Sequence, residues 1–146
     1  MKVLSKPTVK GYVTIYENGE KVYEGENLIV KDGLIESAKA LAQESTDMPV
    51  AMALGDDDTD PSSDDSSLKS EFYREEIGST SRSDTSVTFE NTFEAGDGEG
   101  YVREIGLFSD TEDESGTMFA RISVDERNKT SSDELTVVWT IDFQAI

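Results

Sequence analysis

The sequence predicts a mainly β fold: an antiparallel β-sandwich or partly open barrel with one α-helix packed on it. Apolar residues lie in short runs rich in β-branched and aromatic side chains, as in residues 12–16 and 135–141, and such runs favour strands. Asn18-Gly19 follows the first run and is a strong signal for a two-residue hairpin turn. One stretch after residue 30 has the apolar spacing of an amphipathic helix. Together these observations predict the fold class.

The first part of the chain is predicted to form a β-hairpin followed by the helix. Residues 8–30 contain two strands joined at Asn18-Gly19. Asp32 is a suitable N-cap for a helix at about residues 33–44. The apolar positions of this helix fall on one stripe: Leu34, Ile35, Ala38, Leu41 and Ala42. We expect the stripe to cover one face or one end of the sheet.

Further strands are expected at about residues 49–54, 68–77, 84–94, 101–108, 117–124 and 134–143. The segments between several of them are polar or rich in glycine, which predicts loops at 56–67, 95–100 and 109–116. A length of 146 residues fits one domain with one core. We therefore divide the chain into an N-terminal arm, residues 1–8, and a single β-rich domain, residues 9–146.

The charge is the most unusual feature of the composition. Asp and Glu number 32 and Lys and Arg 13, a formal net charge of −19. Such an excess argues against nucleic-acid binding and against docking on anionic lipid. No run approaches the ~20 apolar residues that span a bilayer, so we expect no membrane insertion. Because molar salt shortens the Debye length to ~3 Å and screens carboxylate repulsion, the acidic coat predicts adaptation to very salty surroundings. An acidic protein of a mesophile is the alternative.

The chain has no Cys and no His. It therefore has no disulfide framework and no thiolate metal site, and it lacks the commonest general base. With 32 acidic residues, carboxylate pairs arise anywhere, and none is marked as the pair of an active site. We expect no enzymatic activity and no catalytic residues.

The acidic loop after residue 55 is the sharpest chemical candidate. Asp56, Asp58 and Asp60 alternate like the first three ligands of a calcium loop. The glycine and the bidentate glutamate of that motif are absent, because Pro61 and Ser67 stand in their places. A solvated loop is the better interpretation, and weak binding of calcium, magnesium, sodium or potassium is the alternative. We expect no other cofactor.

Two arginines stand in apolar-flanked strands. We expect Arg74 to pair with Glu75 or Glu76, and Arg103 to pair with Glu104. A structural role is favoured for both, and contact with a neighbouring subunit is the alternative.

Two further residues invite a functional interpretation. Trp139, on the last strand, is most simply a core residue, with a sugar-stacking role as the alternative. Asn128-Lys129-Thr130 is a formal N-glycosylation sequon in a segment that we expect to be an exposed loop.

Several segments, taken in order over about residues 25–143, resemble small structural proteins of tailed viruses, notably tail-fibre, tail-collar and baseplate-associated domains. The most specific are Glu-Ile-Gly-Leu-Phe at 104–108 and Leu-Thr-Val-Val-Trp-Thr-Ile at 135–141. The resemblance implies a β-rich virion protein that forms homo-oligomers and has no catalytic residues. Combined with the acidic coat, it points to a virus of a haloarchaeon.

The leading hypothesis is a non-enzymatic virion structural protein: a tail, baseplate or fibre-adaptor component that contacts itself and other virion proteins. Residues 1–8 are the candidate arm that reaches a neighbour. The alternatives are a receptor- or glycan-binding module that meets the host cell surface through the three loops, a capsid decoration or turret protein, and a cellular acidic β-domain.

Overall fold

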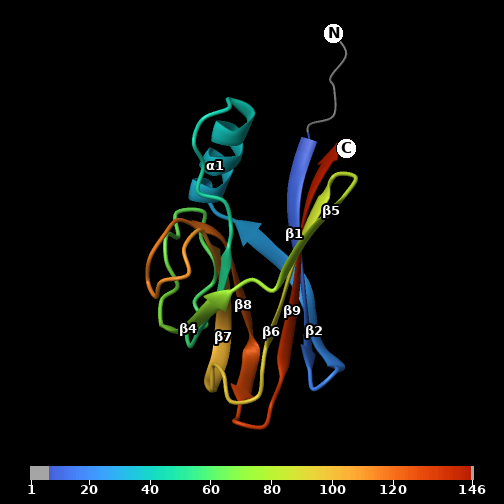
Figure 1. The fold of residues 1–146 in the computed structure, drawn as a ribbon, viewed down its shortest axis with the longest axis vertical. Helices are drawn as coiled ribbons and strands as arrows, with labels where there is room; N and C mark the ends of the chain where they lie inside the picture. The colour runs from blue at the N-terminus through green and yellow to red at the C-terminus, as the bar shows by residue number, and fades with distance from the viewer. Residues whose placement is uncertain (1–6, 146) are drawn as a thin grey trace.

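The computed structural model describes residues 7–145, which form nine strands and one helix (Figure 1). In chain order the elements are β1 (Pro7–Glu17), β2 (Glu20–Ile29), α1 (Lys31–Leu41), β3 (Ala51–Gly55), β4 (Glu71–Glu76), β5 (Ser79–Ser83), β6 (Ser86–Phe93), β7 (Gly100–Phe108), β8 (Met118–Lys129) and β9 (Leu135–Ala145).

The strands form one sheet in the order β4-β3-β7-β8-β2-β1-β9-β6-β5, and every neighbouring pair is antiparallel. The two edge strands, β4 and β5, are consecutive in the chain and are separated only by residues 77 and 78. The sheet therefore curls until its edges approach, and its two halves face each other (Figure 1). This curled half-barrel with one helix confirms the predicted fold class.

The main core lies between the two halves of the sheet. One half contributes alternate residues of β1, β9 and β6, and the other contributes alternate residues of β3, β7 and β8. Trp139 has no exposed surface and lies in this core, so the core interpretation of that residue is confirmed. A smaller apolar cluster lies on the outer side of β3: Val30, Ala51, Ala53, Leu68, Phe108 and Met118. Because Leu68 covers that side, all five residues of β3 are buried.

The predicted hairpin turn is present. Asn18 and Gly19 both have positive φ angles, 52° and 84°, which a two-residue hairpin turn requires. β1 begins at Pro7 and pairs with β9 from there, so Pro7 and Thr8 of the expected arm lie within the sheet. Residues 1–6 of that arm lie outside the described residues.

The helix lies where the sequence predicts it, but it faces the other way. Its stripe is exposed, with 46% of Leu34, 42% of Ile35 and 89% of Leu41 accessible to solvent. The buried residues of α1 are Gly33 and Glu36. A Cβ on Gly33 would lie 2.3 Å from the carbonyl oxygen of Phe119, so only glycine allows the helix to approach β8 this closely. The expectation that the apolar stripe covers the sheet is therefore wrong.

Two other differences concern strands. β5 is not predicted by the sequence, because all five of its residues are exposed and its polar sequence has no apolar alternation. β8 extends to Lys129, so Asn128 lies exposed on a strand and not in a loop. Within the part of the chain that the structure describes, no helix has the length and apolar character needed to cross a membrane.

Candidate functional site

A buried arginine on β8 holds the acidic loop against the sheet. Arg121 is fully buried, and its Nε donates a hydrogen bond of 3.0 Å to Glu104, which is equally buried. Its Nη1 donates to the carbonyl oxygen of Thr59 at 2.9 Å and lies 3.4 Å from the buried carboxylate of Asp65. The guanidinium thus pairs with two buried carboxylates and holds the loop at Thr59 and Asp65.

Glu104 completes this attachment from β7. Its two carboxylate oxygens accept the backbone N–H groups of Lys69 and Ser70 at 2.9 and 2.8 Å. The carboxylate therefore bonds both the loop and Arg121, and its polar atoms have partners in the buried cluster.

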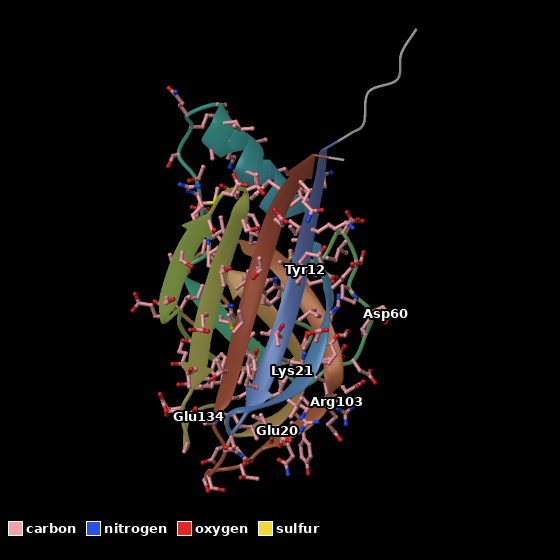
Figure 2. The ribbon with its side chains drawn as sticks, turned by 90° about the vertical axis from the view of Figure 1, so that its right-hand side faces the viewer. Tyr12, Glu20, Lys21, Asp60, Arg103 and Glu134 are labelled. Carbon is pink, nitrogen blue, oxygen red and sulfur yellow. The ribbon has the colours of Figure 1, made fainter. Side chains whose placement is uncertain are left out.

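The three aspartates of the predicted cation site have different surroundings. Asp56 lies 3.2 Å from Nε of Arg103, while Asp58 and Asp60 are exposed, and Asp60 lies at the outer side of the molecule (Figure 2). Asp57, which the motif did not include, has its pKa lowered by hydrogen bonds from the hydroxyl and backbone N–H of Thr59. Among residues 7–145, no group of three or more acidic side chains is arranged to hold a metal ion.

A second buried arginine fixes the loop at 109–116. Arg74 on β4 forms two hydrogen bonds with the carboxylate of Glu71, at 3.0 and 2.7 Å. Its Nη1 donates to the carbonyl oxygens of Asp110 and Ser115, and its guanidinium lies 3.9 Å from the ring centre of Phe108. This acidic loop is thus also held through an arginine.

The ion-pair partners expected for Arg74 and Arg103 are wrong. Arg74 pairs with Glu71, three residues earlier, and Arg103 pairs with Glu126 across to β8 and with Asp56. The reason is that adjacent residues of a strand point to opposite faces. Glu104 therefore faces away from its neighbour and reaches Arg121.

Glu75 on β4 and Lys129 on β8 are two further charged side chains removed from full solvent exposure. Burial is the main cause that raises the pKa of the Glu75 carboxyl, with nearby Asp97 adding to it. Lys129 is 2% exposed, and its Nζ donates to the carbonyl oxygen of Glu94 at 2.8 Å.

An apolar groove lies between α1 and the inner face of β6 and β9, and we call it the α1 groove. Its volume is about 550 Å³. The residues that line it are Ser37, Ala40 and Leu41 of α1, Met48 and Pro49 of the following segment, and Thr80, Val87, Phe89, Phe119, Ile141 and Phe143 of the sheet. Nearly all of these side chains are apolar, and the hydroxyls of Ser37 and Thr80 are the exceptions.

Exposed apolar side chains surround the α1 groove. Phe143 is 42% exposed, and its antiparallel partner Val9 is 37% exposed. The outward stripe of α1 continues this surface around the helix. Apolar patches of this kind mark surfaces that bind another molecule. The lining residues of the groove are almost all apolar, so its chemistry suits an apolar occupant.

Sequence reasoning missed the α1 groove, because its lining residues come from positions 37 to 143. One signal in the sequence was Gly33 in the first turn of the helix. A glycine there allows close contact with a neighbouring strand on its own side of the helix, so the apolar stripe is left facing elsewhere. Comparison of the chain with protein-family models, curated proteins and solved structures finds no match.

Proposed function

We propose that the protein is a non-enzymatic structural component of the virion of a halophilic tailed virus, in its tail, baseplate or fibre adaptor, and that it assembles as a homo-oligomer. The observation that carries the proposal is the exposed apolar surface at one end of the molecule, formed by the α1 groove and the outward stripe of α1. A domain that places such a surface on a rigid β scaffold is suited to an assembly.

The loops support a structural role as well. The acidic loops at 56–70 and 109–116 are each attached to the sheet through a buried arginine, Arg121 and Arg74. The strongly held carboxylates, such as Glu104 and Glu71, bond to arginine or backbone N–H groups and are occupied in holding the fold. This arrangement favours a fixed shape over chemistry.

The acidic surface supports the proposal that the protein works at high salt. With 32 acidic residues and a net charge of −19, repulsion between exposed carboxylates is largely screened only when the Debye length is short. The position on the virion follows from the resemblance to tail-fibre, tail-collar and baseplate-associated domains.

Immunogold electron microscopy tests the proposal. An antibody against the purified protein should label one region of intact tailed particles that are produced by cells carrying the gene. Label that stays with the cells and never appears on particles contradicts the virion role. A second arm measures binding of the purified protein to host envelopes in about 2 M salt, where screening is nearly complete; strong binding by the isolated domain would favour a receptor-binding module instead.

A further inference from the structure

The α1 groove opens at the end of the molecule where β1 begins. Pro7 pairs with Ala145, and Val9 pairs with Phe143, which lines the groove. Figure 1 shows α1, the start of β1 and the end of β9 at this same end. The chain that precedes Pro7 is therefore attached next to the groove mouth.

At this end of the core, apolar side chains that line the α1 groove are exposed to solvent. The inner face of β6 and β9 is covered by the other half of the sheet lower down, where Phe93 and Val137 are fully buried. At the upper end α1 stands in that place, but its Leu41 remains 89% exposed across from Phe143. The exposed apolar surface of Leu41 and Phe143 suits a short apolar segment.

Residues 1–6 have the composition that this site calls for. They include the apolar residues Met1, Val3 and Leu4. The chain has three lysines and no acidic residue before Glu17, although Asp and Glu outnumber Lys and Arg by 32 to 13 overall. It therefore begins with a basic, partly apolar stretch joined to an acidic body.

The rim of the groove has the complementary charge. Glu44 and Asp47 are exposed and lie between Leu41 and Met48, which both line the groove. The carboxyl end of α1 adds a partial negative charge at the same place, since helix dipoles attract cations at that end. Lysines that flank an apolar insert would meet these groups.

We propose that the α1 groove binds residues 1–6 of a second copy of this chain. The inference rests on the homo-oligomer of the proposed function and names the contact that builds it. Six extended residues span at most about 20 Å, which is enough to reach from one molecule into its neighbour. The contact is assigned between copies because a homo-oligomer needs a contact between chains, and the cross-linking experiment below distinguishes it from occupation by the same chain. Such an arm-to-groove contact is heterologous and closes into a ring when its rotation allows.

Thiol cross-linking tests the contact, because the chain has no Cys of its own. We mix full-length Ser5→Cys with full-length Ala40→Cys, an exposed residue that lines the groove, in about 2 M salt and add a short bismaleimide. The expected result is a covalent dimer that contains one copy of each variant. Ala95→Cys is the matched control, since Ala95 is exposed and lies beyond Phe93, at the end of the sheet opposite Pro7. This pair should give at least about tenfold less cross-linked dimer.

A second measurement uses groove variants that keep the fold. Phe143→Ser should weaken self-association by about tenfold or more, as expected for the loss of a large apolar contact. Phe72→Ser, on β4 and 37% exposed against 42% for Phe143, should leave it unchanged. Fluorescence of Trp139 checks that both variants are folded.

Three results would overturn the proposal: no cross-link above the Ala95→Cys control, equal effects of Phe143→Ser and Phe72→Ser, or a Ser5→Cys/Ala40→Cys double variant that links only within one chain. Sedimentation of the unmodified protein separates this failure from failure of the proposed function. An oligomer that gives no cross-link contradicts only the arm-to-groove contact. A wild-type protein that stays a monomer contradicts the homo-oligomer itself.

Discussion

Replacing Arg121 tests whether the buried ion cluster holds the acidic loop in place. Arg121→Met replaces the guanidinium with an apolar side chain of similar length. It leaves the buried carboxylate of Glu104 without a cation and leaves Asp65 with only Lys69, at 3.3 Å. Removal of one partner from a buried ion pair costs about 3–5 kcal/mol. Glu104 keeps two backbone donors, at residues 69 and 70, so we expect a value near the lower end, about 3 kcal/mol.

This loss is large for a domain of this size. Single domains are stable by about 5–15 kcal/mol, and each kcal/mol shifts the melting temperature by about 2–4 °C in a chain of this length. Arg121→Met should therefore melt about 6–12 °C lower than wild type. Arg103→Met is the matched control. Arg103 is 39% exposed and its pairs with Glu126 and Asp56 are near the surface, so its loss should cost less than about 1 kcal/mol.

Urea unfolding at a fixed salt concentration of about 2 M measures the difference, with fluorescence of the one tryptophan, Trp139, as the signal. Urea is preferred because guanidinium is itself a salt and would change the screening of the acidic coat. A loss for Arg121→Met below about 1 kcal/mol, or no larger than that of Arg103→Met, would refute the reasoning. Arg121→Met combined with Glu104→Gln should recover part of the loss, because the stranded charge is removed.

Three further predictions concern pH and salt. Burial raises the pKa of Glu75 above its ordinary value of 4.5, so the folded state holds the proton of this carboxyl more tightly than the unfolded state does. The stability due to Glu75 therefore falls as pH rises above 4.5. Glu75→Gln should raise the urea midpoint at pH 7 and leave it nearly unchanged below pH 4.5. Hydrogen bonds from Asn18 and Thr130 lower the pKa of Asp133 from 3.8 to about 2. The stability that the Asp133 carboxylate contributes is therefore present above pH 3.8 and is lost as pH falls toward 2. Asp133→Asn should lack this pH-dependent loss of stability in acid unfolding followed by Trp139 fluorescence, and an unchanged acid profile would contradict the assignment. Circular dichroism should show loss of folded structure, or sedimentation should show loss of assembly, below about 0.1 M salt, where the Debye length reaches about 10 Å. A spectrum and a sedimentation profile that both stay constant from molar salt to that point would contradict the haloadaptation.

Much of the sheet can be predicted from the sequence, because burial on one face imposes a period of two. The run at residues 135–141 alternates around Trp139 and lies in the core as β9. β5 shows where this signal ends: Ser79–Ser83 is exposed throughout, and its backbone pairing with β6 holds it as a strand without any apolar pattern.

The direction of the helix could not be predicted from its stripe. A stripe such as Leu34, Ile35 and Leu41 normally faces the core. Here Gly33 makes the close contact with β8, and Glu36 is buried because its carboxylate accepts the backbone N–H of Asp47 at 2.8 Å. Both are tertiary contacts that the helix sequence alone does not encode.

The candidate site was missed for a related reason. Runs of neighbouring acids drew attention to Asp56, Asp58 and Asp60, while the partners that fix the loop, Arg121 and Glu104, lie more than thirty residues away in the chain. The α1 groove likewise joins Leu41 to Phe143. Spacing along a sequence reports local structure, and these contacts depend on how the sheet curls.

Sedimentation velocity in about 2 M salt tests the central claim, that this acidic β-domain is a part of a homo-oligomeric assembly. The wild-type protein should sediment as a discrete oligomer. A variant that lacks residues 1–6, and so keeps all of β1 from Pro7 onward, should sediment as a monomer with an unchanged circular dichroism spectrum. A wild-type protein that remains a monomer at every concentration would contradict the central claim, whereas a truncated variant that forms the same oligomer would contradict only the arm-to-groove contact.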